Sequence, residues 1–204
     1  MLLAALLLPA AALADTGANY RSSFYNGTRS FLHRNSMAQV NGGGGILFVR
    51  MQQNVTGSPS LDQVGWHRSL NIPDDCPSTG NLDAFIEWIT TSNVFTCNVY
   101  SESSGDEQFG MVYLSSGAGW QAYRNSLALG APHALGWSSG NPLVGGEHHG
   151  VADTVDGCFG CSGNLAWQVS TDNGNSYVNV SVCQQIINTG WSVVCPPSPF
   201  RIHN

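Results

Sequence analysis

The chain has 204 residues, of which 42% are hydrophobic and only 10% are charged, and its formal net charge is −6. This composition supplies enough apolar side chains for a packed core and excludes a disordered chain. All seven basic residues are arginines scattered along the sequence, so the clustered positive charge that nucleic-acid binding requires is missing.

The N-terminal residues form an apolar run, MLLAALLLPAAALAD, with Ala12-Leu13-Ala14 near its end. Small residues in this pattern are recognised by signal peptidase, so residues 1–14 are predicted to be a signal peptide cleaved before Asp15. A buried helix is the alternative interpretation. The run is too short to span a bilayer. We therefore expect a secreted, extracellular protein with no membrane contact after cleavage.

The rest of the chain is typical of an all-β protein. Residues 15–44 are predicted to be an N-terminal arm, residues 45–195 a single antiparallel β-sandwich of the jelly-roll type, and residues 196–204 a C-terminal tail. Runs rich in β-branched and aromatic residues, with turn residues between them, lie at 45–53, 62–70, 84–91, 95–102, 108–116, 165–171 and 177–186. Many short strands with regular turns favour a sandwich or jelly roll.

Six cysteines follow the predicted signal peptide: Cys76, Cys97, Cys158, Cys161, Cys183 and Cys195. An even number in an exported chain predicts disulfides. Cys76 and Cys97 are expected to pair, because a hairpin-like segment separates them. The pairing of the other four stays open, and their CFGC motif is also a common half of a zinc site. The second half has no matching CxxC, so we expect disulfides, no metal and no cofactor.

Strand alternation predicts that side chains with chemistry from three segments share one surface. If Trp66 packs in the core, Gln63 and His67 lie on the opposite face of their strand. The residues expected on this surface are Gln63, His67, Glu87, Glu147 and His149. They meet only if their strands lie side by side in matching register.

The segment PLVGGEHHG (142–150) places a carboxylate and two histidines behind two glycines. His148 and His149 point to opposite faces of a strand, so they are poorly placed to bind one metal ion. Convergence of Glu147, His149 and His67 on a metal is the weaker alternative. Gly145 and Gly146 would let a substrate backbone approach the sheet. We expect His149 to line a groove there.

Six motifs occur in an order and spacing that resemble the neprosin-type glutamic peptidases, and their exported bacterial relatives in particular. They lie within residues 45–170 and are QVGW (63–66), FIEW (85–88), TCNVY (96–100), GWQAYRNS (119–126), VGGE (144–147) and NLAWQV (164–169). The resemblance implies a β-sandwich whose carboxylate groove hydrolyses peptides at acid pH. By position, Glu147 matches the family's second catalytic glutamate, whereas the first falls on Gln63.

The glutamine at a catalytic position leaves two hypotheses. A fungal family of glutamic peptidases is understood to work with a Gln and Glu pair, so Gln63 and Glu147 are compatible with catalysis. Alternatively, the site is inactive and the chain is a binding module on an enzyme fold, because fold does not guarantee chemistry.

Peptide hydrolysis at acid pH needs a carboxylate that deprotonates water and then protonates the leaving amine. It also needs a donor to the tetrahedral oxyanion. Glu147 is predicted to be the base and acid, and Gln63 the donor, because an amide donates hydrogen bonds without exchanging protons. Glu87 is the alternative partner, since two close carboxylates supply acid and base together. The residues predicted to contact substrate are Glu87, His67, His149, Gly145, Gly146 and Trp120.

The six tryptophans support a different hypothesis, a non-catalytic domain that binds carbohydrate or cell wall by stacking sugars on exposed rings. A surface protein of unknown partner is the third hypothesis. The expected ligand is therefore a peptide or a polysaccharide. A Ser-His-Asp hydrolase is disfavoured, because the sequence has no Gly-x-Ser-x-Gly motif.

Overall fold

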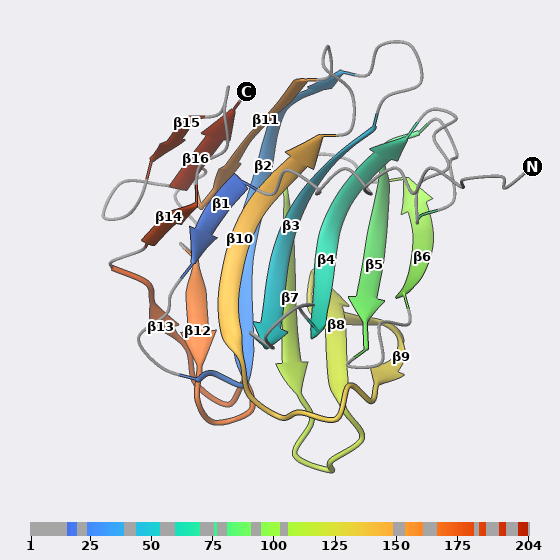
Figure 1. Ribbon diagram of the computed structural model, residues 1–204, viewed down its shortest axis with the longest axis vertical. Coiled ribbons are helices and arrows are strands. Elements are labelled where there is room, and N and C mark those ends of the chain that lie inside the picture. Colours follow the sequence, from blue (N-terminus) through green and yellow to red (C-terminus); the bar gives the residue numbers. More distant parts are fainter. Residues whose placement is uncertain are drawn as a thin grey trace, which may run out of the picture.

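The computed structural model describes residues 16–19, 24–38, 44–53, 60–69, 76, 81–90, 95–102, 106–148, 154–160, 167–181, 184–186, 192–194 and 200–203. They form two antiparallel β-sheets that pack face to face as a sandwich (Figure 1). The predicted all-β sandwich is confirmed. Among these residues there is no helix of the length and hydrophobicity needed to cross a membrane.

The first sheet carries the candidate site and has the strand order β14-β1-β10-β3-β4-β5-β6. Its strands are β14 (Gln184–Ile186), β1 (Thr16–Asn19), β10 (Asn141–His148), β3 (Gly44–Gln53), β4 (Ser60–Ser69), β5 (Asp83–Ile89) and β6 (Phe95–Glu102). β3 lies between β10 and β4, so segments far apart in the sequence become neighbours in the sheet.

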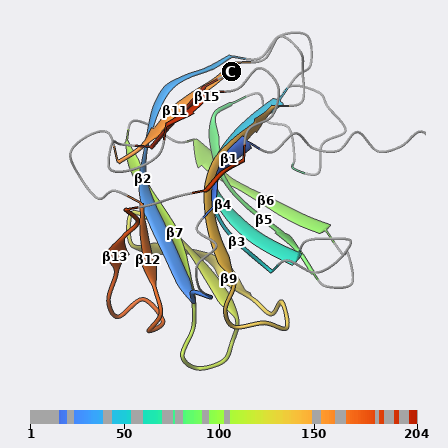
Figure 2. The same ribbon diagram turned by 60° about the vertical axis from the view of Figure 1, so that its left-hand side comes forward.

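The second sheet has the order β15-β16-β11-β2-β7-β8-β9, with β12 paired to β2 and β13 to β12. Its strands are β15 (Ser192–Val194), β16 (Phe200–His203), β11 (Thr154–Phe159), β2 (Gly27–Ala38), β7 (Glu107–Tyr113), β8 (Trp120–Arg124), β9 (Leu127–His133), β12 (Gln168–Ser170) and β13 (Val178–Asn179). Figure 2 shows the two layers from the side, with β2 and β7 in one and β3 to β6 in the other.

Segments predicted to flank the sandwich contribute strands to it. β1 and β2 lie within the predicted arm, 15–44, and β2 pairs with β7, β11 and β12. β16 lies within the predicted tail and pairs with β11 and β15. The inward-facing residues of β2 include Thr28 and Ser30, both fully buried, which weakens the hydrophobic alternation by which a strand is recognised.

The core between the sheets is built from alternate residues of facing strands. Leu47 and Val49 of β3 and Trp66 of β4 are essentially inaccessible to solvent, as are Phe109 and Trp120 from the second sheet. The rings of Trp66 and Phe109 meet edge to face, with centroids 6.0 Å apart. Each such side chain contributes about 1.5–3 kcal/mol to folding through burial. Because these residues must face the core, the residues that alternate with them along each strand point outward.

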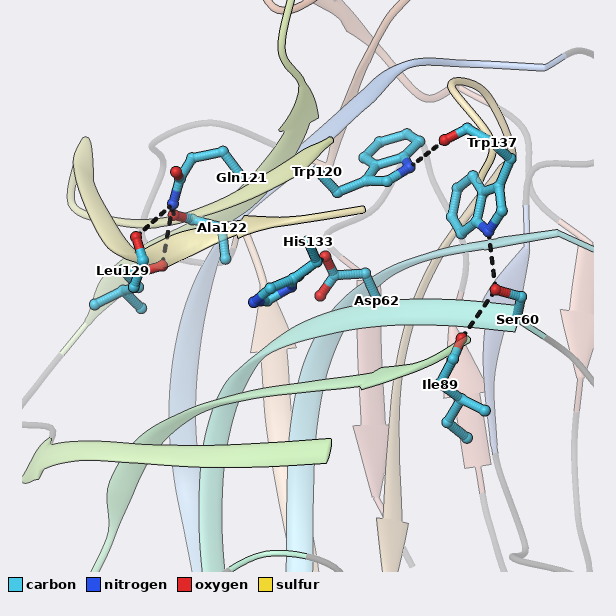
Figure 3. A network of polar contacts seen from close by, with 10 residues as sticks. Ser60, Asp62, Ile89, Trp120, Gln121, Ala122, Leu129, His133 and Trp137 are labelled. Carbon is cyan, nitrogen blue, oxygen red and sulfur yellow. Dashed lines mark hydrogen bonds and ion pairs between the residues drawn. The ribbon is translucent and has the colours of Figure 1, made fainter. Parts of the chain in front are cut away.

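Buried tryptophans in the core satisfy their N–H groups within the protein. Trp120 Nε1 donates to the carbonyl oxygen of Trp137 at 2.9 Å, and Trp137 Nε1 donates to Ser60 Oγ at 2.9 Å (Figure 3). Ser60 Oγ in turn donates to the carbonyl oxygen of Ile89 at 2.9 Å. These bonds link the second sheet to strands β4 and β5.

A second polar pair, Asp62 and His133, also connects the sheets (Figure 3). His133 Nδ1 lies 2.9 Å from Asp62 Oδ2, and the His133 ring stacks on Trp88 with centroids 3.7 Å apart. Asp62 is completely buried. Burial raises the pKa of the Asp62 carboxyl, while the hydrogen bond and charge of His133 and the backbone N–H of Gln63 oppose the rise.

The predicted disulfide between Cys76 and Cys97 is confirmed, with the two Cα atoms 5.0 Å apart. Cys158 is also disulfide-bonded, and no cysteine among the described residues is free. Cys161, Cys183 and Cys195 lie outside the described residues.

Candidate active site

The register of the four strands β10, β3, β4 and β5 aligns the candidate residues on one face of the first sheet. The first cross-strand row contains Glu147, Ile46, His67 and Asp83; the second contains Gly145, Phe48, Gly65 and Phe85; the third contains Leu143, Arg50, Gln63 and Glu87. This register places Gln63, His67, Glu87 and Glu147 on one face of the sheet, as the alternation in the sequence predicts. The face has its own small hydrophobic cluster, separate from the main core.

Arg50 joins the two predicted catalytic residues. Its Nε donates to Gln63 Oε1 at 2.7 Å, and its Nη2 donates to Glu147 Oε1 at 2.5 Å. The guanidinium carbon also lies 4.2 Å from the centre of the Phe48 ring, within the range of a cation–π interaction. The sequence interpretation had not identified Arg50, and the structure places it between the amide and the carboxylate.

The contact with Arg50 fixes the orientation of the Gln63 amide. A guanidinium can only donate hydrogen bonds, so the amide oxygen must face Arg50 and the amide NH₂ must point elsewhere. Gln63 Nε2 is buried and has no hydrogen-bond partner in the part of the chain that the structure describes. An unsatisfied buried donor costs about 1–3 kcal/mol, so its presence requires an explanation, and a hydrogen bond to a bound ligand would provide one.

The three side chains are enclosed rather than lining an open groove as the sequence interpretation expected. Gln63 is 0% exposed, Arg50 2% and Glu147 3%. Burial strengthens their mutual interactions because the local dielectric constant is low. A substrate or a water molecule can reach them only if the atoms that cover them move.

Glu87 lies in the same row as Gln63 and directly opposite it on β5. It is 9% exposed, and its Oε2 is 4.0 Å from the Cys76 sulfur. On its other side, Glu87 is opposite Cys97 of β6. The Cys76–Cys97 disulfide therefore borders this second carboxylate.

His67 is buried, with its ring 5.9 Å from that of Phe85, and it is opposite Asp83 on β5. His149 lies outside the described residues. Within the described ranges, no three His, Cys, Asp or Glu side chains are grouped so that they could hold a metal ion.

The two predicted glycines differ in position. Gly145 is opposite Phe48, in the row between Glu147 and Arg50. Gly146 faces the other way, where an added Cβ would lie 3.3 Å from Val155 Cγ1 and 3.4 Å from Leu47 Cδ2. Gly146 is therefore explained by packing between the sheets, and the prediction that it contacts substrate is wrong.

The prediction that Trp120 contacts substrate is also wrong. Trp120 belongs to β8 of the second sheet and is 0% exposed, because its ring fills the core beside Trp137, 4.7 Å between centroids. Trp66 and Trp167 are equally buried, Trp88 stacks on His133, and Trp191 lies outside the described residues. The described tryptophans do not form an exposed platform for sugars.

The sequence pattern did not predict roles for Arg50, Asp62 and His133, and only Arg50 is conspicuous in the sequence. Arg50 is the one charged residue in the strand GILFVRMQQ, 45–53, and a lone charge in an apolar strand is a candidate for a buried pair. Asp62 and His133 carried no comparable signal, because their pairing depends on how the two sheets stack.

No family model and no curated protein matches this chain. Solved structures of similar fold include scytalido-glutamic peptidase with a transition state analog inhibitor, at a TM-score of 0.62 and 15% identity over 93% of this chain and 97% of that one. The same peptidase with a peptide-based transition state analog has a TM-score of 0.61 and 13% identity, over 93% and 97%.

A third structure of similar fold is SCP-B, an eqolisin-family peptidase in complex with the tripeptide Ala-Ile-His. Its TM-score is 0.55 and its identity 14%, covering 94% of this chain and 96% of that one. At these identities the comparison establishes a shared fold. The chain therefore has the fold of the eqolisin glutamic peptidases, and none of these three structures is named as a neprosin.

Proposed function

We propose that this protein is a glutamic-type endopeptidase that hydrolyses peptide bonds at acid pH, with Glu147 and Gln63 as its catalytic residues. The observation that carries the proposal is the arrangement around Arg50. One guanidinium contacts both the Glu147 carboxylate and the Gln63 carbonyl oxygen, and the Gln63 Nε2 donor is left without a partner. The shared fold with eqolisin peptidases supports it.

In the proposed reaction, the Glu147 carboxylate takes a proton from a water molecule, whose oxygen attacks the carbonyl carbon of the peptide. The carbonyl oxygen becomes an oxyanion that accepts a hydrogen bond from Gln63 Nε2. Glu147 then gives its proton to the amide nitrogen as the C–N bond breaks. The products are a carboxylic acid and an amine, and Glu147 returns to its ionised form.

Arg50 is assigned two positioning roles in this scheme. Its Nε holds Gln63 Oε1 at 2.7 Å, so that the amide NH₂ faces the oxyanion instead of rotating away. Its Nη2 contacts Glu147, and a guanidinium beside a carboxylate favours the ionised form that a general base requires. A free glutamate ionises near pH 4.3, so an ionised Glu147 is compatible with acid conditions.

Burial of this cluster argues against an ordinary surface role. Taking an arginine and a glutamate out of water costs several kcal/mol for each ion before their attraction is counted, and the pair adds little that apolar side chains could not supply. Ionisable groups that are buried together with a specific charge partner are candidates for a functional site. The enclosure also means that substrate binding has to open the site.

The experiment is to incubate the purified protein with an unfolded protein substrate at about pH 3 to 5 and at neutral pH, and to identify new termini by mass spectrometry. We expect cleavage in the acid samples and little at neutral pH. A folded protein that cleaves nothing at any pH, and that is retained on insoluble polysaccharide, would instead support the carbohydrate-binding hypothesis.

We also propose that the protein works outside the cytoplasm. The disulfides at Cys76–Cys97 and at Cys158 persist in oxidising compartments. The apolar N-terminal run is the expected export signal, and N-terminal sequencing of secreted protein would test cleavage before Asp15.

A further inference from the structure

A cavity of about 240 Å³ lies on the outer face of the second sheet, on the opposite side of the sandwich from Gln63 and Glu147. It is smaller than the roughly 300–1,000 Å³ of sites for drug-sized ligands. Its polar lining includes Arg29, Gln108, Tyr123, Asn173 and Tyr177.

The cross-strand register explains why a hollow forms there. Arg29 of β2 is opposite Gly110 of β7, and Gly110 is opposite Tyr123 of β8. The glycine between these two long side chains leaves the centre of the row empty. A Cβ at Gly110 would lie 2.7 Å from Arg29 Cβ, so close contact between β2 and β7 also excludes a larger residue.

Another part of the cavity wall is the turn between β12 and β13, which is held in one conformation by hydrogen bonds. Asp172 Oδ1 accepts from Ser170 Oγ at 2.7 Å and from the Ser176 backbone N–H at 2.9 Å. Asn173 N–H donates to Asn26 Oδ1 at 2.8 Å. Asn173 and Gly174 both have positive φ, 57° and 78°. The turn is therefore built before any ligand arrives, which lowers the entropic cost of binding.

Arg29 is the charged residue among those that line the cavity, and its guanidinium has more hydrogen-bond donors than its contacts with the protein use. Its Nε donates to Gln168 Oε1 at 2.8 Å, and its guanidinium lies 3.8 Å above the Tyr177 ring. No carboxylate of the described residues forms an ion pair with it. Stacking on Tyr177 fixes the plane of the guanidinium, so its Nη groups are positioned to bind a carboxylate in the cavity.

The other groups that line the cavity are suited to a small ligand that accepts hydrogen bonds and has an apolar part. Gln108 Nε2 has no hydrogen-bond partner within the described ranges. Burial raises the pKa of the Tyr177 hydroxyl, which keeps the ring neutral and able to donate. Val112 supplies apolar contact. We propose that this cavity binds a small organic carboxylate, the size of one amino acid or one sugar acid, with Arg29 as its counter-charge.

The test is a calorimetric titration of the intact protein at about pH 6, where such acids are ionised. The probes are N-acetyl-leucine against N-acetyl-leucinamide, and galacturonic acid against galactose. We expect saturable binding of at least one acid and none of its uncharged counterpart; the acid that binds identifies the source of the carboxylate. Equal binding of acid and counterpart, or no binding of either acid, would overturn the proposal.

Two variants locate the site. Arg29→Gln is expected to weaken binding of the acid by about tenfold or more, because a hydrogen bond to a charged group is lost. Arg201→Gln is the control, since Arg201 is exposed and lies outside the cavity, and it should bind as the wild type does. Unchanged binding in a folded Arg29→Gln would contradict the assignment. No peptidase activity is measured, so the result is independent of the function proposed for Glu147.

Discussion

Arg50 Nε donates to Gln63 Oε1 across two neighbouring strands at 2.7 Å, with both side chains buried. Because the arginine can only donate, this one contact determines which end of the amide faces outward from the pair. It makes the Gln63 amide an oriented hydrogen-bond donor.

Gln63→Leu is expected to lower kcat for peptide cleavage by roughly 10²–10³-fold, the usual effect of removing one oxyanion donor. KM should change less, because the donor acts mainly on the transition state. Steady-state kinetics on a single peptide measures both constants. A rise in KM alone, with kcat preserved, would show that Gln63 holds the substrate and does not stabilise the oxyanion.

Arg50→Met is expected to destabilise the protein by about 3–5 kcal/mol at neutral pH, because it removes one partner of a buried ion pair and leaves the Glu147 carboxylate without the guanidinium beside it. Adding Glu147→Gln should recover part of that loss, since neither charge of this buried ion pair then remains. Urea unfolding of the two single variants and the double variant gives the coupling energy. Strictly additive effects would contradict the ion pair.

Glu87→Gln is the matched control for the base. Glu87 faces Gln63 directly across the strands, so it is the other carboxylate available to the site. The variant keeps the size of the side chain and one acceptor oxygen but cannot exchange a proton, and it should retain most of the acid peptidase activity. Loss of activity in Glu87→Gln, with activity preserved in Glu147→Gln, would transfer the role of base to Glu87.

The alternation of apolar and polar residues was sufficient to predict much of the outer face of the first sheet. Alternation placed Gln63 with His67, Glu87 and Glu147 because each strand has an apolar inner face, such as Val64 and Trp66 on β4. The pairing of Cys76 with Cys97 was predicted separately, from the hairpin-like segment between them. Arg50 could not be assigned the same way, since its partners come from two other strands and their identity depends on the β10-β3-β4 order.

β2 shows a second limit of sequence patterns. Its inner residue Thr28 is polar, yet it is satisfied in the core, where Trp167 Nε1 donates to Thr28 Oγ1 at 2.9 Å. That bond forms between residues far apart in the chain, so hydrophobicity alone could not reveal β2 as a core strand. Gly146 and Trp120 were misassigned for the converse reason, because packing between the sheets, not substrate contact, explains them.

Asp62 links stability to pH. Its folded-state pKa is raised by burial, so the folded chain keeps a proton that the unfolded chain releases near pH 3.9. The contribution to stability is complete below that pH and is lost as the pH rises through the folded value. Asp62→Asn keeps an oxygen acceptor for His133 and should flatten this decline, leaving the variant relatively more stable than the wild type at neutral pH.

The measurement for Asp62 is the free energy of unfolding in urea at several pH values from about 3 to 7. Parallel pH profiles for the wild type and Asp62→Asn would contradict the role of this carboxyl. A steeper decline in the wild type would confirm that the Asp62 carboxyl makes the fold relatively more stable at acid pH.

The most direct test of the central claim is the initial rate of peptide cleavage at about pH 4 by the wild type and by Glu147→Gln, purified in parallel. A cooperative urea transition in both proteins, with a folded baseline at the pH of the assay, would establish that both are folded. We predict that the wild type cleaves the peptide and that the variant has no measurable activity, because an amide cannot accept and return the proton. Equal rates for the two proteins would contradict the assignment of Glu147 as the catalytic base.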